Sequence, residues 1–154
     1  MVDVVWALIA FLLAFHAGYA LWIARRLDRL HRRVDAAANA LDEQLRARAT
    51  AAAGSRGLKP AAADALATAG LGRDREQAES ALSRAIGAIH PDEALVSATA
   101  RAGYARAFFN DTVRDALVVR RRRIVRAFRL AGSAPLPSFF EMDEAIPARR
   151  TIGV

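Results

Sequence analysis

The sequence predicts an all-α fold: an N-terminal transmembrane helix that continues into an antiparallel cytoplasmic helical bundle. Three observations support this class. An uncharged apolar run fills most of the first 24 residues, apolar residues recur at helical spacing after it, and strand-like alternating runs bounded by turn residues are lacking. Alanine, leucine and arginine are frequent, and all three are among the best helix formers.

We expect three parts: a membrane anchor at residues 1–24, a helical bundle at 25–132, and a tail at 133–154. The roughly 130 residues after the anchor suffice for one modest core. The first half of the tail should pack on the bundle through its two phenylalanines, Phe139 and Phe140. Its end, from about Ala148, should be disordered, as chain termini often are.

The anchor is expected over Val4–Ala24, which holds 21 residues without a formal charge. As a helix it would be roughly 31 Å long, which matches the roughly 30 Å hydrocarbon core of a bilayer. Trp6 near one end, and Tyr19 and Trp22 near the other, would place aromatic rings at the two membrane interfaces.

Two other interpretations of this apolar run stay open. A cleaved signal peptide has a positive region ahead of a shorter apolar core, whereas only Met1, Val2 and Asp3 precede this run. A buried core helix of a soluble domain is the other alternative. His16 is the one ionisable residue inside the run, and without an acidic partner we interpret it as tolerated rather than functional.

Basic residues follow the apolar run and none precede it, which sets the expected orientation. The cluster consists of Arg25, Arg26, Arg29, Arg32 and Arg33. The positive-inside rule then places the amino terminus outside and residues 25–154 in the cytoplasm. The expected location is the inner (plasma) membrane of a bacterium, crossed once. The lack of cysteine agrees weakly with a reducing compartment.

The helix should continue from the membrane to about Ala53 and end at the glycine-containing turn 54–57. Its apolar stripe, close to a coiled-coil seam, comprises Leu27, Leu30, Val34, Ala37, Leu41, Leu45, Arg48 and Ala52. Pro60 can open a short alanine-rich helix over 61–69 that Gly70 closes. Because its apolar face is weak, we expect it to be the least stable element.

Two further helices complete the predicted bundle. Asp74 and Gln77 form a capping-box pattern that would open a helix to about Ile89. Asp92 can cap the last and longest helix, which should reach about Leu130. Its inward positions are expected at Leu95, Thr99, Ala102, Ala105 or Arg106, Phe109, Val113, Leu117, Ile124 and Phe128. Short connections between the helices favour an antiparallel up-and-down arrangement.

Three stretches match the pattern of one known family in order and spacing. Tyr104–Val113 has an Ala-Arg pair, an aromatic residue and then Asn-Asp; Leu27–Leu45 has Arg-Val-Asp and later Asp-Glu-Gln-Leu; Pro135–Glu141 ends in Phe-Phe-Glu. Together with the amino-terminal anchor, these stretches resemble the LemA family. Ala51–Ala62, and Val118 and Val119 with the four arginines after them, depart from the family's pattern, which suggests a divergent member. The resemblance implies a membrane-anchored helical bundle and no defined activity.

The chain has no recognisable catalytic pattern. It lacks a phosphate loop, a dinucleotide fingerprint and a nucleophile elbow. It also lacks cysteine, and no two of its histidines, His16, His31 and His90, share metal-ligand spacing. We therefore expect no enzyme, no catalytic residue, no cofactor and no metal site.

Asn110 and Asp111 are the sharpest polar candidates, because both lie in the middle of a predicted helix, where such residues are poor helix formers. One hypothesis is that they contact a docking partner or a ligand. The favoured hypothesis is a buried polar pair that fixes helix register, with Arg106 or Arg114 as its partner.

The net charge of +7 arises almost wholly from arginine, since Lys59 is the only lysine. Six arginines in ten residues form a basic amphipathic cluster: Arg120, Arg121, Arg122, Arg123, Arg126 and Arg129. Such a cluster can bind anionic lipid headgroups. Nucleic acid phosphates are less favoured, because stacking aromatic residues and a recognised module are missing. A solvated helix end or a bias of GC-rich coding would explain the arginines without a binding role.

The expected function is that of a non-enzymatic scaffold or interaction protein at the membrane, with the lipid bilayer and an unidentified protein as partners. The alternative is a membrane-tethered module that binds anionic lipid or nucleic acid through residues 120–129. The candidate interaction residues are Asn110, Asp111, Arg120, Arg121, Arg122, Arg123, Phe139 and Phe140.

Overall fold

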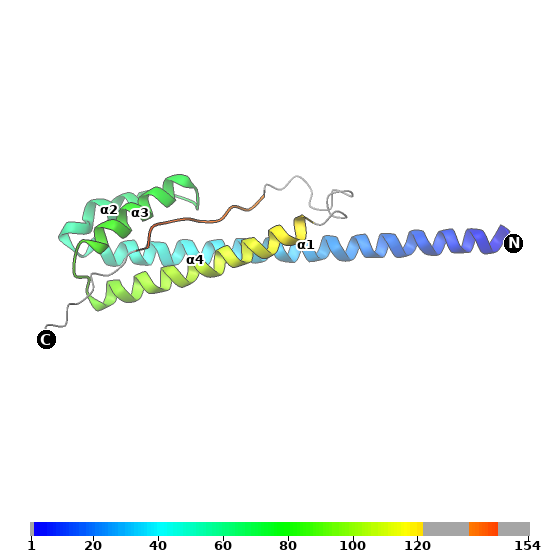
Figure 1. Ribbon diagram of the computed structural model, residues 1–154, viewed down its shortest axis with the longest axis horizontal. Coiled ribbons are helices and arrows are strands. Elements are labelled where there is room, and N and C mark those ends of the chain that lie inside the picture. Colours follow the sequence, from blue (N-terminus) through cyan, green and yellow to red (C-terminus); the bar gives the residue numbers. More distant parts are fainter. Residues whose placement is uncertain (1, 122–135, 145–154) are drawn as a thin grey trace. The chain divides into compact units, whose positions relative to one another are not determined.

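The computed structural model describes residues 2–121, which form α-helices and connecting turns, and residues 136–144, which have no regular secondary structure (Figure 1). The helices are α1 (Val2–Ala53), α2 (Lys59–Ala67), α3 (Arg73–Gly87) and α4 (Glu93–Arg120), with a short 3₁₀ turn, η1 (Arg56–Leu58), before α2. Within the described ranges there is no β-strand. The prediction of an all-α protein is therefore confirmed.

Helix α1 continues without a break across the predicted end of the anchor at residue 24, as expected. It ends at Ala53, because the glycine-containing turn that follows redirects the backbone: the Ser55 amide donates to the Ala52 carbonyl at 2.9 Å. The turn then leads through η1 into α2, and Pro60 lies in the first turn of α2. Backbone N–H groups in a first turn have no intrahelical acceptor, so proline, which has no N–H, loses no hydrogen bond there. Helix α2 ends at Ala67 with Thr68 as its C-cap, so the prediction that Gly70 closes this helix is wrong. Gly70 lies in the connection to α3, where it adopts a φ of 76°, a left-handed conformation that glycine takes without strain.

The start of α3 corrects one prediction. Gly72 is the N-cap in extended conformation without a side-chain cap, and the helix begins at Arg73. Asp74 therefore lies inside the first turn, where its carboxylate suits the helix dipole, and the predicted capping box with Gln77 is wrong. The helix ends at Gly87, slightly before the predicted Ile89.

The predicted cap of α4 is confirmed. The Leu95 amide donates to Oδ1 of Asp92 at 2.8 Å, which satisfies one of the N–H groups that a helix start leaves without an intrahelical acceptor. The predicted inward positions Ala102, Phe109 and Val113 are buried, whereas Thr99 and Leu117 are partly buried. The helix is described to Arg120. Its predicted continuation to Leu130, with Ile124 and Phe128, lies outside the described residues.

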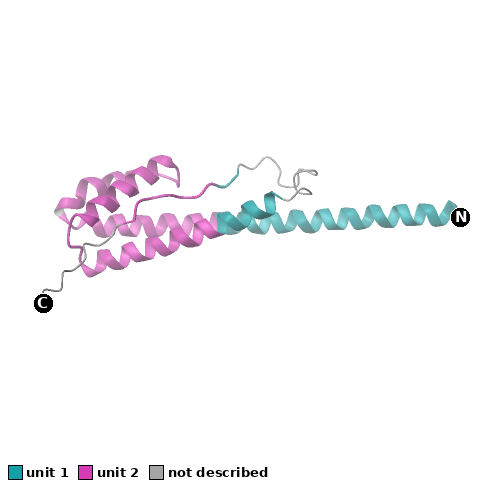
Figure 2. Cartoon of the chain, viewed as in Figure 1, with its two compact units in different colours: residues 1–34, 112–137 teal, residues 35–111, 138–154 magenta. Residues whose placement is uncertain are grey.

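Two compact units make up the chain: residues 1–34 with 112–137, and residues 35–111 with 138–154 (Figure 2). In the second unit a core of small and aliphatic side chains joins α1, η1, α2, α3 and α4. Its buried members are Ala49, Ala52, Leu58, Ala62, Ala65, Leu82, Ile86 and Leu95. Helix α2 packs on α3 and enters this core through Ala62 and Ala65, both fully buried. Short alanine side chains allow the backbones to approach closely, so a weakly apolar helix still finds a packed face.

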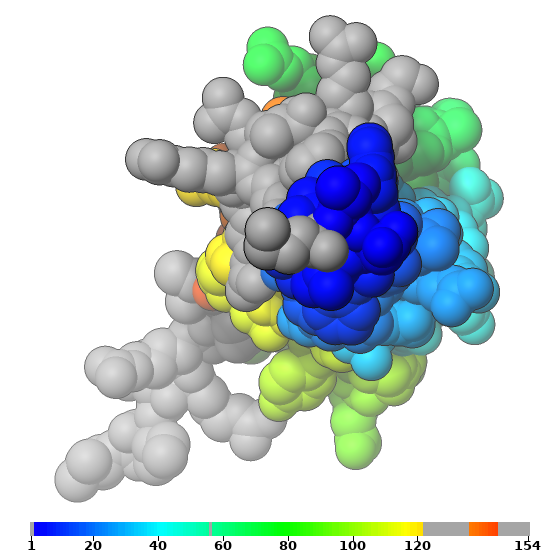
Figure 3. All heavy atoms as spheres, turned by 90° about the vertical axis from the view of Figure 1, so that its right-hand side faces the viewer, coloured from blue at the N-terminus to red at the C-terminus, as the bar shows by residue number. Residues whose placement is uncertain are grey.

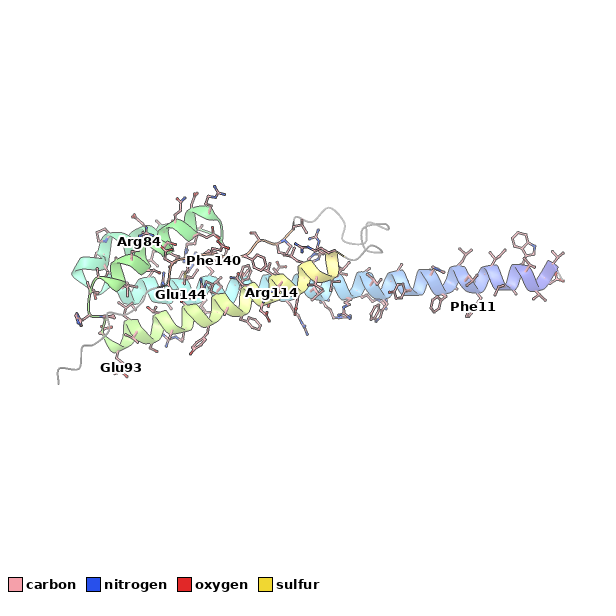
Figure 4. All side chains as sticks on the ribbon, in the orientation of Figure 1. Phe11, Arg84, Glu93, Arg114, Phe140 and Glu144 are labelled. Carbon is pink, nitrogen blue, oxygen red and sulfur yellow. The ribbon has the colours of Figure 1, made fainter. Side chains whose placement is uncertain are left out.

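The first unit contains the apolar run of α1, most of whose side chains lie at the surface. An 18-residue window of α1 has a mean hydropathy of 2.0 and none of it is buried, so this helix is long and apolar enough to cross a membrane. Phe11 projects away from the helix (Figure 4), and the amino-terminal residues are surface residues in the space-filling view (Figure 3). At the end of the run Ile23, and just after it Leu27, pack against Val119 of α4, with Leu30 at the edge of the cluster.

Candidate interaction site

The most elaborate polar arrangement in the described residues holds residues 138–144, here called the docked segment. This segment is extended and lacks regular secondary structure. The side chains of α3 and α4 that hold it form the docking site: Glu76, Ser80 and Arg84 from α3, and Arg106 and Asn110 from α4. Within each helix these residues are four apart, so each set lies along one face.

Asn110 binds the backbone of Phe140 twice. Its Nδ2 donates to the Phe140 carbonyl at 3.0 Å, and the Phe140 amide donates to its Oδ1 at 2.9 Å. A side-chain amide carries one acceptor and one donor group, so it pairs with a peptide unit as a neighbouring strand would. This contact corrects the favoured hypothesis that Asn110 pairs with Arg106 or Arg114. Asp111, its predicted companion, is exposed.

The remaining contacts alternate between the two helices. The Glu141 amide donates to Oε1 of Glu76 at 2.9 Å and the Asp143 amide donates to Oγ of Ser80 at 3.0 Å, both on α3. On the α4 side, Arg106 donates to the carbonyl of Met142 at 3.1 Å. In an extended chain successive peptide groups point to opposite sides, so even residues are held by α4 and odd residues by α3.

The two phenylalanines of the docked segment differ in burial. Phe140 is 1% exposed, whereas Phe139 is 40% exposed. The prediction that both rings pack on the bundle is thus correct for Phe140 and wrong for Phe139, because side chains of an extended chain alternate between two faces. Figure 4 labels Phe140 of the docked segment and Arg84 of α3.

Two ion pairs fix the acidic end of the docked segment. Arg84 pairs with Asp143, and Arg106 pairs with Glu144. Three of the four side chains are exposed, so each pair contributes little to stability on its own. The pairs join acidic residues of the segment to arginines of the helices, so the site favours negatively charged side chains at these two positions of the segment.

Sequence reasoning missed a second polar cluster, in which Arg48, Arg75, Glu79 and Ser83 are buried. Arg48 of α1 donates to Oγ of Ser83 at 3.1 Å and to the Glu79 carbonyl at 3.0 Å, and it also forms an ion pair with the Glu79 carboxylate. Arg75 donates to the other carboxylate oxygen of Glu79 at 2.8 Å and lies 3.5 Å from Asp42. Burial lowers the pKa of Arg48, and the Glu79 carboxylate partly offsets this shift. The sequence carried one signal of this buried cluster, because Arg48 occupies a position of the apolar stripe of α1.

A cavity of about 360 Å³ adjoins the end of the docked segment. It is lined by Arg48 of α1, by residues of α4, and by Met142 and Glu144; the α4 residues are Thr99, Ala100, Gly103, Tyr104, Arg106 and Ala107. Two of these lining residues have buried polar atoms, Nε of Arg48 and Oγ1 of Thr99, that find no hydrogen-bond partner among the described residues.

The predicted arginine cluster is described only at its start. Arg120 is half-buried and Arg121 is exposed, both in the first compact unit, whereas Arg122 and Arg123 lie outside the described residues. Of the candidate residues from the sequence, the structure brings together Asn110 and Phe140. The disorder expected from Ala148 onwards also falls outside the described part of the chain.

Comparison with known proteins found no match for this chain among protein-family models, curated proteins or solved structures.

Proposed function

We propose that this chain is a membrane-anchored helical-bundle protein that acts as a non-enzymatic scaffold or interaction protein at the inner membrane of a bacterium. The observation that carries the proposal is the apolar run of α1, in which an 18-residue window has a mean hydropathy of 2.0 and no burial within the protein. Water would leave this large apolar surface unfavourably exposed, whereas the hydrocarbon core of a bilayer would cover it.

Interfacial side chains at the end of the run support the same placement. The rings of Tyr19 and Trp22 stack with centroids 6.0 Å apart, and the Arg26 guanidinium lies 5.7 Å from the Trp22 ring centre. An aromatic pair topped by a cation suits the boundary between hydrocarbon and headgroups. The arginines from Arg25 onwards then favour a cytoplasmic location for the rest of the chain, with the amino terminus outside.

Contacts inside each unit support an antiparallel bundle. In one unit Leu95, near the start of α4, shares a core with Ala49 and Ala52 of α1. In the other, Val119, near the end of α4, packs with Ile23 and Leu27. Each unit therefore contains contacts between α1 and α4. The three LemA-like stretches also favour such an anchored bundle, and we propose that the chain is a divergent member of that family.

A second candidate function is the binding of anionic lipid through the arginine cluster. The Val119 contact favours it, because Arg120 and Arg121 follow directly after a residue that packs beside the end of the apolar run. Arginines near an anionic membrane surface each contribute about 1 kcal/mol of attraction, which salt screens.

One extraction experiment tests both candidates. The chain is incorporated into zwitterionic or anionic vesicles and washed with alkaline, high-salt buffer. The variant Leu8→Arg/Leu12→Arg places two charges in the run, which raises the free energy of insertion by about 5–7 kcal/mol. We expect the unchanged chain to resist washing and this variant to be released. The control, Ala63→Arg/Val96→Arg, adds the same charge at exposed positions of α2 and α4 and should stay bound.

The outcomes separate the two candidates. If the unchanged chain is released as readily as the charged variant, the anchor is refuted. If the charged variant binds anionic vesicles at low salt but not zwitterionic ones, the arginines bind lipid; absence of this residual binding excludes the lipid role.

A further inference from the structure

One face of α1 changes from aromatic to basic where the apolar run ends. Tyr19 and Trp22 stack there, with ring centroids 6.0 Å apart, and the Arg26 guanidinium lies 5.7 Å from the centre of the Trp22 ring. Helical spacing of three and four residues places Arg29 and Arg33 on the same face, and all five side chains are exposed. We call Trp22, Arg26 and Arg29 the boundary site.

The boundary site lies at the depth of lipid phosphates if the run spans a bilayer. At about 1.5 Å per residue, Arg26 and Arg29 lie about 3 and 8 Å beyond Ala24, where the run ends, whereas Arg33 lies about 14 Å beyond it. The headgroup layer on each side of the hydrocarbon core is about 5–8 Å thick. Because helix side chains lean towards the amino terminus, the two arginines of the boundary site lean towards the bilayer.

The arginines after the run have no carboxylate partner among the described residues. All 16 acidic side chains of the chain lie within residues 2–121 and 136–144. Within these ranges none of them forms an ion pair with Arg25, Arg26, Arg29 or Arg33. The neutralising anion for these charges therefore has to come from outside the described chain, and anionic lipids supply it at a membrane surface.

The contact with Trp22 prepares Arg26 for a phosphate. It holds the guanidinium beside the indole ring, and in the described part of the chain no hydrogen bond uses the Arg26 donors. A guanidinium presents its N–H groups in a rigid fork that matches two oxygens of one phosphate. Holding this flexible side chain in place before binding reduces the entropy that binding costs.

We propose that the boundary site binds the phosphate of an anionic phospholipid, with Arg26 and Arg29 as donors and the Trp22 ring as the platform for Arg26. This inference rests on the proposed membrane anchor, and its residues are separate from the arginine cluster 120–129. A phospholipid is favoured over a free phosphate, because its acyl chains can cover the exposed apolar run that lies directly beside the site.

Quenching of tryptophan fluorescence in vesicles tests the proposal, because the chain has two tryptophans, one near each end of the run. Trp6→Phe leaves Trp22 as the only reporter. Trp22→Phe leaves Trp6, which is also exposed and has no arginine before it. Each form is incorporated into vesicles of phosphatidylglycerol and phosphatidylcholine in which one lipid or the other carries brominated, quenching acyl chains. We expect phosphatidylglycerol to be enriched about fivefold beside Trp22, as for one arginine at an anionic surface, and not beside Trp6.

Three variants of the Trp6→Phe form separate a built site from diffuse attraction. Arg26→Gln should reduce the enrichment to less than about twofold, and Arg26→Lys should reduce it nearly as much, because lysine keeps the charge but not the planar fork. The matched control, Arg33→Gln, removes the same charge from the same face beyond the headgroup layer and should leave the enrichment unchanged.

Three results would overturn the proposal: equal enrichment beside Trp22 and Trp6, equal losses for Arg26→Gln and Arg33→Gln, or full enrichment with Arg26→Lys. Enrichment that inorganic phosphate abolishes, while sulfate at the same ionic strength does not, would make free phosphate the ligand instead of a lipid. If neither brominated lipid quenches either tryptophan, the run is not in the bilayer and the anchor itself is refuted. Quenching of both tryptophans without lipid preference keeps the anchor and removes only the boundary site.

Discussion

Arg48 lies in the apolar stripe of α1, and in the core it forms an ion pair with Glu79 of α3. Glu79 stands between Arg48 and Arg75 and binds both, so one carboxylate balances part of the charge of two buried guanidinium groups, and Asp42, 3.5 Å from Arg75, adds a second negative charge. The stripe pattern predicts that position 48 is buried, because it recurs with Leu41 and Leu45. It could not predict the partners, because they lie on α3 more than 30 residues away and carry no local signal.

The arrangement predicts an unequal response to two substitutions. Glu79→Gln leaves two buried cations with a neutral amide, so it should lower the free energy of unfolding by about 3–5 kcal/mol. Arg48→Met keeps the pair between Arg75 and Glu79 and places an apolar side chain of similar length in the core. It should cost less than about 2 kcal/mol. Chemical denaturation of the detergent-solubilised chain measures both, and an Arg48→Met loss equal to or larger than that of Glu79→Gln would contradict this account.

Asn110 illustrates a different limit at the same scale. Its position in the middle of a helix correctly marked it as a residue with a special contact. The sequence favoured arginine partners on the same helix, one turn away, because local pairs are the ones a helical pattern displays. The actual partner, the backbone of Phe140, is 30 residues away in a segment without periodicity.

Helix positions were predictable where the local signal was complete. Asp92 caps α4 because its side chain reaches the Leu95 amide, as the sequence indicates. Asp74 carries the same kind of signal but fails as a cap, because Gly72 takes an extended conformation and starts α3 earlier. The docked segment could be predicted only as a packed tail. Its contacts with α3 span more than 60 residues and use backbone groups that every sequence possesses.

Neighbouring phenylalanines test the helical phase of α4. Phe109 is 5% exposed and Phe108 is 66% exposed. Phe109→Ala should lower the free energy of unfolding by about 3–5 kcal/mol, since it removes a buried ring and leaves a cavity. Phe108→Ala, the matched control, should lower it by less than about 1 kcal/mol. Thermal or chemical denaturation distinguishes them, and similar losses for both would show that the assigned phase is wrong.

At the scale of the whole molecule, composition is the most informative feature. The uncharged run before Arg25 and the arginine-rich remainder divide the chain into a part suited to lipid and a part suited to water and anionic surfaces. The helical class and the exposed apolar run of α1 followed from this division, because both depend on residue type and spacing alone. Partners and the side of the membrane depend on surroundings that the fold does not contain.

The central claim is that residues 4–24 cross the membrane and leave the helical unit in the cytoplasm. Because the chain has no cysteine, single cysteines placed on either side of the run report their location without background. Bacteria that express Val2→Cys or Ala63→Cys are treated with a maleimide that cannot cross the inner membrane, before and after lysis. The account predicts that Val2→Cys is labelled in intact cells and Ala63→Cys only after lysis. Labelling of Ala63→Cys in intact cells, or protection of Val2→Cys there, would contradict it.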